Sequence, residues 1–334
     1  MPDAGVFPAS TIERDRFVLD RRGSRVQHDP FTHHGLIVED ERTSEGARAR
    51  VATVLLTGRE CPWRCTMCDL WRYTTTTDTP RGAIPAQIAG ARGAMGSEPV
   101  TVFKLYNAGS FFDPRAVPEA DYDAIAAGLS GLERVVVESH PALVGPRVDR
   151  FLAALKRHAH NPPRLEVAMG LETAHPDALE RLNKRFTLEA FHRAARALGD
   201  RDVALRVFLL ISPPFVPADE QESWLLESVD AAFSCGATVV SLVPTRAGNG
   251  AIDALADAGM FRRPDLDDIE RGFALALERG RHRGRVFVDL WDLDRFATCS
   301  GCLAPRRERL HAMNLEQRDV PPVVCSAGDH ALHA

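Results

Sequence analysis

The sequence predicts an α/β fold built around a parallel sheet. Seven apolar, β-branched runs recur along the chain, and their starting points lie about 30 to 50 residues apart. Most of these runs are continuously apolar, which is typical of strands buried on both faces. The segments between them carry helical periodicity. Strand and helix therefore alternate, and the sheet is either a barrel or doubly wound.

The predicted strands, in chain order, are Val51–Thr57, Val100–Tyr106, Arg134–Glu138, Leu165–Leu171, Val203–Ile211, Thr238–Val243 and Arg285–Leu290. Between them, residues 148–155, 188–198 and 266–276 each carry an apolar stripe at helical spacing. Pro217 suits the first turn of another helix, which Gly236 would end.

Composition and charge exclude several classes of protein. The chain has 334 residues, of which 45% are hydrophobic and 26% charged, as in folded globular domains. The formal net charge of −5 gives no bias toward nucleic acid or acidic membranes. No apolar run reaches the roughly 20 residues of a membrane helix, and residues 1–20 carry charges where a signal peptide needs an apolar core. We therefore expect a cytoplasmic protein whose seven cysteines are reduced thiols.

Three regions differ in their patterning. Residues 1–49 form a polar, Arg-rich N-terminal extension with weak periodicity. Residues 50–245 contain six of the seven predicted strands and form the core. Residues 246–334 form a C-terminal region that contains the last three cysteines, with little regular pattern after about residue 295.

The first predicted strand leads directly into a cysteine-rich loop. Cys61, Cys65 and Cys68 follow it with the spacing C-x3-C-x2-C, at the strand end where parallel α/β folds build active sites. Three thiolates can hold three irons of a 4Fe-4S cluster and leave the fourth iron open to a small molecule. Structural zinc needs four ligands, and no fourth Cys or His lies near this loop. A zinc site with a remote ligand, or three incidental thiols, are the alternatives.

This loop resembles the signature of the radical S-adenosylmethionine (SAM) superfamily. Within the superfamily the chain is most similar to the branch that contains tRNA methylthiotransferases, the elongator catalytic subunit and the archaeosine synthase radical subunit. Residues 103–114, with Gly-Ser-Phe-Phe-Asp, and residues 170–187, with Leu-Asn-Lys-Arg, carry this narrower similarity. The resemblance covers roughly residues 48–245. It implies a partial (β/α)6-type TIM barrel with a parallel sheet, followed by a cysteine-containing C-terminal extension.

The resemblance also implies two cofactors and a shared chemistry. Cys61, Cys65 and Cys68 would hold a 4Fe-4S cluster that reductively cleaves SAM, and the 5′-deoxyadenosyl radical would abstract hydrogen from a substrate. The implied partners are SAM and an electron donor such as flavodoxin or ferredoxin. The branch favours a tRNA base as substrate, although the net charge gives this no support. A peptide or a small metabolite stays open.

Residues at four strand ends match positions where the superfamily binds SAM. Asn107, Ala108, Gly109 and Ser110 resemble the motif that holds the methionine amino group, although they replace the common Gly-Gly-Glu. Glu138 ends the third predicted strand, and Glu172 follows the fourth, near the expected SAM ribose or methionine. Met67 stands where an aromatic residue usually precedes the third cysteine, which predicts weaker stacking on the adenine.

Charged residues inside apolar strands need a partner, a ligand or access to the barrel mouth, because an unpaired buried charge is costly. Arg206 fits a structural ion pair or a ligand contact, and Asp289 fits a substrate contact or a satisfied rim position. His175 precedes a proline at a helix start, which favours a capping role. Cys235, before Gly236, is expected to be a buried small side chain.

The C-terminal cysteines form a second group. Cys299 and Cys302 have C-x2-C spacing, and Cys325 follows after 22 intervening residues. An auxiliary Fe-S cluster, a zinc site completed by His330, and no metal at all are the three alternatives. Residues 306–309 form a basic run that suits either a phosphate contact or a solvated helix face.

Two functional hypotheses follow from these patterns. The first is a radical SAM enzyme. The second is a zinc-stabilised, non-catalytic binding module, which accounts for the C-terminal cysteines but not for the first cysteine loop. Iron with acid-labile sulfide supports the first hypothesis, and zinc without iron supports the second.

Overall fold

The computed structural model describes residues 7–107 and 109–324 of the chain. Eight strands form one sheet in the order β1 to β8, so neighbours in sequence are neighbours in space. β1 pairs antiparallel with β2, and every later pairing is parallel. The strands are β1 Gly35–Arg42, β2 Arg48–Leu56, β3 Val102–Asn107, β4 Arg134–Glu138, β5 Arg164–Glu172, β6 Ala204–Ile211, β7 Ala237–Pro244 and β8 Arg285–Val288.

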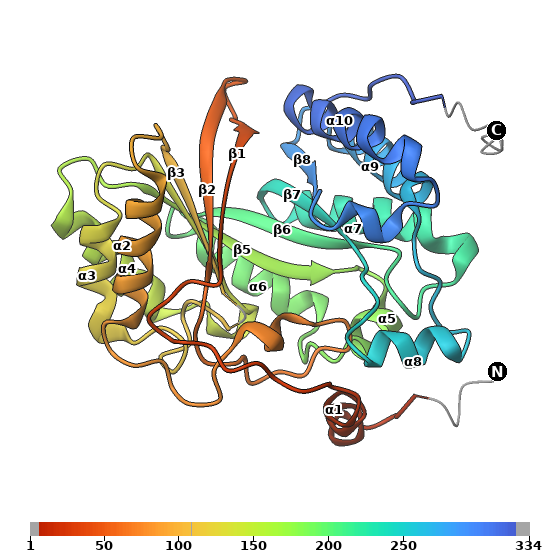
Figure 1. Cartoon of the computed structure of the whole chain (residues 1–334), viewed down its shortest axis with the longest axis horizontal. Coiled ribbons are helices and arrows are strands. Elements are labelled where there is room, and N and C mark those ends of the chain that lie inside the picture. Colours follow the sequence, from red (N-terminus) through yellow and green to blue (C-terminus); the bar gives the residue numbers. More distant parts are fainter. Residues whose placement is uncertain (1–6, 108, 325–334) are drawn as a thin grey trace.

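The sheet curls into a partial barrel with helices along its outer face (Figure 1). The helices are α1 Thr11–Asp20, α2 Ala83–Met95, α3 Tyr122–Gly128, α4 Pro146–His158, α5 Pro176–Arg181, α6 Leu188–Gly199, α7 Gln221–Ser234, α8 Ala251–Asp257, α9 Leu266–Gly280 and α10 Ser300–Glu316. This confirms the predicted partial barrel, and all seven predicted strands are present as β2 to β8. None of the helices in the described part of the chain is long and apolar enough to cross a membrane.

Both faces of the strands are buried, but in different surroundings. The large apolar core lies on the face of the sheet that packs against the helices, with Val54, Leu105, Val137 and Val207 among its members. A smaller cluster of Val51, Val102, Val136 and Ala168 occupies the inner face. Burial on both faces explains why these strands are continuously apolar in sequence.

Two side chains at the carboxyl-terminal end of α10, one in the helix and one just after it, cover the free edge of β8. The Val288 N–H donates to Asn314 Oδ1 at 2.8 Å, and Asn314 Nδ2 donates to the Val288 carbonyl at 2.9 Å. Gln317, just after α10, makes the same pair of bonds to Val286, both at 2.8 Å. These two amides therefore satisfy edge groups that would otherwise need another strand.

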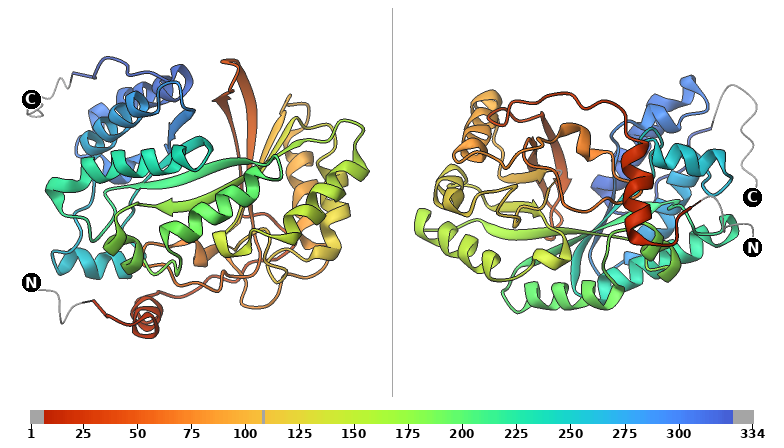
Figure 2. Two further views of the ribbon diagram at one scale, coloured as in Figure 1. Left: turned by 180° about the vertical axis from the view of Figure 1, so that it is seen from behind. Right: turned by 90° about the horizontal axis from the view of Figure 1, so that it is seen from below.

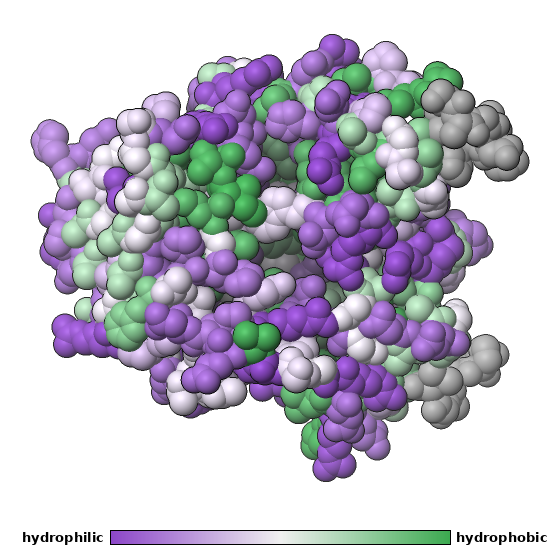
Figure 3. All heavy atoms as spheres, in the orientation of Figure 1, coloured by the Kyte–Doolittle hydropathy of each residue, from purple (hydrophilic) through white to green (hydrophobic). Residues whose placement is uncertain are grey.

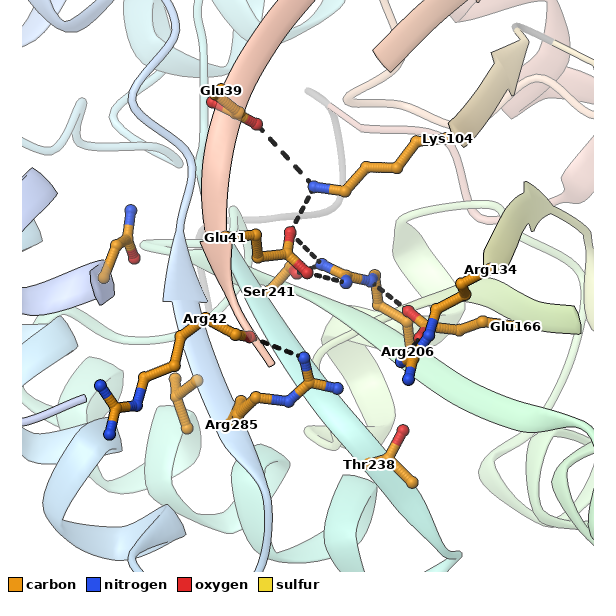
Figure 4. A network of polar contacts seen from close by, with 12 residues as sticks. Glu39, Glu41, Arg42, Lys104, Arg134, Glu166, Arg206, Thr238, Ser241 and Arg285 are labelled. Atoms are coloured by element: carbon orange, nitrogen blue, oxygen red, sulfur yellow. Dashed lines mark hydrogen bonds and ion pairs between the residues drawn. The ribbon is translucent and has the colours of Figure 1, made fainter. Parts of the chain in front are cut away.

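A buried network of ion pairs crosses the inside of the barrel (Figure 4). Arg206 of β6 donates to Glu41 of β1 and to Glu166 of β5, both at 2.6 Å. Lys104 of β3 donates to the other oxygen of Glu41 at 2.5 Å, and Arg134 donates to Glu166 at 2.9 Å. Arg206 is thus in a structural ion pair, and β1 is fixed across the barrel to β6.

The N-terminal residues wrap around the cysteine loop. The helix α1 lies beside α8 (Figure 2), where Phe7, Phe17 and Val18 share an apolar cluster with Ile252 and Leu255. Further along, Arg22 forms an ion pair with Glu60, the residue before Cys61, at 2.7 Å. The extension therefore supports the loop that carries the first three cysteines.

Candidate functional site

A cavity of about 420 Å³ lies inside the curled sheet. The face shown in Figure 3 is hollowed near its centre. The lining residues come from β1, the cysteine loop, the carboxyl ends of β3 to β8, and α10. Among the predicted site residues, the cavity is lined by Cys61, Cys65, Met67, Cys68, Asn107, Gly109, Ser110, Glu138 and Glu172.

The three cysteines of the loop after β2 all line this cavity. Burial raises the pKa of Cys61, Cys65 and Cys68 to about 12. The thiols are therefore protonated at neutral pH in the chain without a metal. Metal or cluster binding would have to displace these protons, because the thiolate is the ligand.

Hydrogen bonds from distant segments fix the backbone of the cysteine loop. The Thr66 N–H donates to the Leu182 carbonyl at 3.0 Å. Asn183 Nδ2 donates to the Arg64 carbonyl at 2.8 Å, and Asn249 Nδ2 donates to the Thr66 carbonyl at 2.8 Å. The segment after α5 and Asn249, two residues before α8, thus hold the loop between the first and third cysteines.

Asn107 and Glu138 form the next part of the site, at the ends of β3 and β4. The Asn107 N–H donates to Glu138 Oε2 at 2.9 Å. Burial raises the pKa of Glu138 to about 8, and the Asn107 hydrogen bond acts in the opposite direction. Asn107 Oδ1 is buried and accepts no hydrogen bond from any described residue. The pair therefore offers a ligand one amide acceptor and a carboxyl group that holds its proton at neutral pH.

Gly109 has a steric reason for its position. A Cβ on this residue would lie 2.8 Å from the Arg59 carbonyl oxygen and 2.9 Å from Ala116 Cβ. A side chain at Gly109 would displace the backbone that leads into the cysteine loop. Ala108 lies outside the described residues, and Ser110 Oγ accepts from the His140 N–H at 2.7 Å.

Glu172 forms a buried ion pair with Lys184, whose Nζ donates to Glu172 Oε1 at 2.5 Å. Burial lowers the pKa of Lys184, but Glu172 and the neighbouring Cys65 and Cys68 together raise it by more, so the net pKa is raised. Glu172 has a φ of 71° and follows a bulge in β5. A Cβ on Gly170 would lie 2.1 Å from Glu172 Oε1, so the pair needs glycine there.

His140, two residues after β4, connects to the segments after β3 and α5 and was not predicted as a site residue. Its ring Nε2 donates to the Lys184 carbonyl at 2.9 Å, and Nδ1 accepts from the Ala142 N–H at 3.2 Å. Burial lowers its pKa to about 4, so the ring is neutral. No short motif encodes this arrangement, because its partners lie up to 44 residues away.

The other predicted residues take structural roles or lie elsewhere. His175 caps α5 as predicted, accepting from the Ala178 N–H at 3.2 Å. Arg306 and Arg309 are buried and ion-paired with Glu270, so neither forms an exposed phosphate contact. Asp289 pairs with Arg246 at 2.5 Å on the cavity wall.

The C-terminal cysteines do not join this cavity. Cys299 occupies the position before the first residue of α10, and Cys302 is buried in the first turn of this helix. Neither of them lines the cavity. Cys325 and His330 lie outside the described residues, so the predicted convergence of this group stays a prediction.

The donor set of the cavity fits a cluster with a polar small-molecule ligand. Three thiols face it, and Asn107 Oδ1 is a buried acceptor without a protein donor. Within residues 7–107 and 109–324, no three His, Cys, Asp or Glu are arranged to hold a single metal ion. A 4Fe-4S cluster differs from a single ion because each thiolate binds a separate iron.

Comparison with known proteins agrees with this geometry. No protein-family model matches the chain. Archaeosine synthase subunit beta of Methanosarcina acetivorans is 29% identical over 236 residues, which cover 67% of this chain and 66% of that protein. An uncharacterized protein of Methanocaldococcus jannaschii is 25% identical over 171 residues, covering 50% of this chain and 46% of that protein. The chain spans just under two thirds of the first curated relative and about half of the second.

The solved structure of Elp3 from Methanocaldococcus infernus superposes with a TM-score of 0.50 over 79% of this chain and 63% of that one. The chain has the radical SAM fold. The sequence identity in this superposition is 11%, so the likeness is one of fold. This shared fold agrees with the partial barrel that the resemblance predicted.

Proposed function

We propose that the protein is a radical SAM enzyme that holds a 4Fe-4S cluster through Cys61, Cys65 and Cys68. The observation that carries this proposal is that the three thiols line one cavity with the polar ends of β3, β4 and β5. When bound, the cluster and SAM would supply a 5′-deoxyadenosyl radical that abstracts hydrogen from a substrate.

The residues around the cysteines would bind and orient SAM. Asn107 Oδ1 suits an ammonium donor, because it is buried and has no donor from the described residues. Glu138 would present a protonated carboxyl group, since its pKa of about 8 lies above neutrality. Glu172 and Lys184 neutralise each other and fix the end of β5.

The finer parts of the proposal concern substrate, partners and location. A tRNA base is the proposed substrate, supported by the branch resemblance and by the archaeosine synthase relative. A one-electron donor such as flavodoxin or ferredoxin is the proposed reductant. Cytoplasmic location is proposed from the reduced cysteines.

We also propose that Cys299, Cys302 and Cys325 form a second metal site, as an auxiliary cluster or zinc. The support is their C-x2-C spacing and the position of Cys299 and Cys302 within one turn at the start of α10. In this proposal residues 50–245 form the catalytic core. Residues 1–49 contribute β1 to the wall of the cavity, and residues 246–334 contribute β8 and α10.

Anaerobic reconstitution of the full chain tests the main proposal. We expect about four irons bound by the first cysteine group, with acid-labile sulfide, and 5′-deoxyadenosine formed from SAM with dithionite. Cys65→Ala should abolish this cleavage. Cys235→Ala is the matched control, because Cys235 is a half-buried thiol at the end of α7 away from the cavity. A folded wild-type chain that binds zinc but no iron would support the non-catalytic binding module instead.

A further inference from the structure

An arginine with unused hydrogen-bonding capacity lies on the wall of the cavity formed by the ends of β7 and β8. Arg246 comes two residues after β7, and 18% of its side chain is exposed. Its Nη2 donates to Asp289 Oδ2 at 2.5 Å and to the Trp291 carbonyl at 3.0 Å. Both partners follow β8, so the guanidinium bridges two strand ends.

The rest of the guanidinium is poorly satisfied. Arg246 Nε is buried and has no hydrogen-bond partner among the described residues. Its nearest carboxylate oxygen, Asp292 Oδ2, is 3.8 Å away, which is an ion-pair distance but too long for a hydrogen bond. A guanidinium has five N–H donors, and Nη2 alone makes its hydrogen bonds to the described residues.

The other cations of the cavity wall differ from Arg246. Lys184 and Lys104 each donate at 2.5 Å to a buried carboxylate. Arg206 donates from Nε, Nη1 and Nη2 to Glu166, Ser241 and Glu41. These three cations belong to satisfied pairs or networks. Arg246 keeps its positive charge, as arginine side chains do in proteins: burial lowers its pKa, but Asp289, Asp69 and Asp292 together raise it by more.

Arg246 lies within electrostatic reach of the cysteine loop, because Asp69, the residue after Cys68, contributes to its raised pKa. On its other side, Trp291 and His311 line the same cavity. The residues proposed to bind SAM follow β3, β4 and β5, whereas Arg246 follows β7, and β6 separates the two groups in the sheet. A ligand at Arg246 would therefore lie beside the proposed SAM site.

We infer that Arg246 binds an anionic group of the substrate, a carboxylate or a phosphate. The inference rests on the proposed function, because only an enzyme has a substrate whose anionic group Arg246 could bind. Anion binding at Arg246 itself does not require the 4Fe-4S cluster. Arginine suits this role because its planar fork matches the oxygens of both anions. Asp289 and the Trp291 carbonyl fix the guanidinium through Nη2, and Nε is buried, so the N–H groups of Nη1, which donate to none of the described residues, are left for the ligand.

Titration of small anions tests the inference directly. Inorganic phosphate and acetate are titrated into the full-length chain, before and after cluster reconstitution with saturating SAM, and followed by calorimetry. We expect binding to the wild type in both states, and at least tenfold weaker binding to Arg246→Gln. Stronger binding of phosphate or of acetate identifies which anion the substrate carries.

Two further variants control for folding and for general electrostatics. Arg246→Lys keeps the charge beside Asp289 but loses the fork, so it should fold normally and bind with intermediate affinity. Arg295→Gln removes an exposed cation that donates to the Ala247 carbonyl and does not line the cavity. Anion binding by this variant should equal that of the wild type. Circular dichroism checks the fold of each variant.

Several results would overturn the inference. One is equal anion affinity in the wild type and Arg246→Gln, or no anion binding by the wild type. Another is that SAM abolishes the binding of phosphate and acetate to the wild type and that Arg246→Gln binds SAM tenfold more weakly. Arg246 would then bind the carboxylate of SAM and not an anionic group of the substrate. Failure of the proposed function would appear separately, as a reconstituted wild type that binds phosphate or acetate but does not cleave SAM.

Discussion

The indole ring of Trp63 stacks on the imidazole ring of His140, with ring centroids 3.5 Å apart and planes inclined by 11°. Trp63 lies between the first two cysteines of the loop, and His140 follows β4. His140 is itself held by Ser110, Ala142 and Lys184. The stack therefore connects the cysteine loop, which follows β2, to the segment after β4, where hydrogen bonds hold His140 in place.

Trp63→Leu should weaken this connection. Loss of the ring contact would cost about 1 kcal/mol of stability, and we expect iron to leave the reconstituted protein several-fold faster in the presence of a chelator. Trp224→Leu is the matched control. It removes the contact of Trp224 with His175, at 4.6 Å and 59°, on helix α7 away from the cavity. Equal rates of iron release in the two variants would contradict a role of the stack in holding the loop.

The buried pair of Glu172 and Lys184 leads to a second prediction. Lys184→Met leaves the Glu172 carboxylate buried without its cation, which should lower the free energy of unfolding by about 3 kcal/mol. The double variant Glu172→Gln with Lys184→Met removes both charges and should recover most of this loss. Urea denaturation of the wild type, the two single variants Lys184→Met and Glu172→Gln, and the double variant measures the coupling. Additive effects of the two substitutions would show that the two groups do not interact.

Much of the fold could be predicted because its strands are buried on both faces and its helices carry regular apolar stripes. Two elements escaped this reasoning. In β1, all residues are only partly buried, and Glu39 and Glu41 line the cavity inside the barrel, so the strand lacks the continuous apolar run of the others. The helix α10 contains Pro305, and two of its three arginines, Arg306 and Arg309, are buried against carboxylates outside the helix. Local patterns do not encode such distant partners.

The residues of the candidate site also fall into those that sequence patterns predicted and those that depend on distant contacts. The cysteines, Asn107, Glu138 and Glu172 could be proposed from spacing and from their places at strand ends. Lys184 was noted only as part of the Leu-Asn-Lys-Arg motif, with no role of its own. No role was predicted for His140 or Arg246. Their positions depend on contacts between segments far apart in the chain, such as the 44 residues between His140 and Lys184.

The amides that cover the edge of β8 lead to a third prediction. Asn314→Leu removes both bonds to Val288 and leaves a backbone N–H and C=O without partners, so we expect a loss of about 2 kcal/mol of stability. Glu316→Ala, at an exposed site on the same helix, should change stability by less than about 0.5 kcal/mol. Denaturant midpoints give both values. An unchanged midpoint for Asn314→Leu would mean that water replaces the amide at this edge.

The carboxyl group of Glu138 predicts how stability depends on pH. Burial raises its pKa in the folded chain to about 8, from 4.5 in the unfolded chain. Between these values the folded state retains a proton that the unfolded state has lost, so the free energy of unfolding falls as pH rises from about 4.5 to 8. Above pH 8 the folded state carries a buried carboxylate, and this contribution stays at its minimum.

Glu138→Gln removes this titration and keeps an oxygen that can accept from the Asn107 N–H. We expect the variant to gain stability over the wild type as pH rises, with the difference growing between pH 5 and pH 8 to a few kcal/mol and then levelling off. Urea denaturation at a series of pH values measures the difference. A constant difference across this range would mean that Glu138 ionises in the folded chain as it does in water. The same variant should still assemble the cluster, because Glu138 contributes no thiolate to the loop that would hold it.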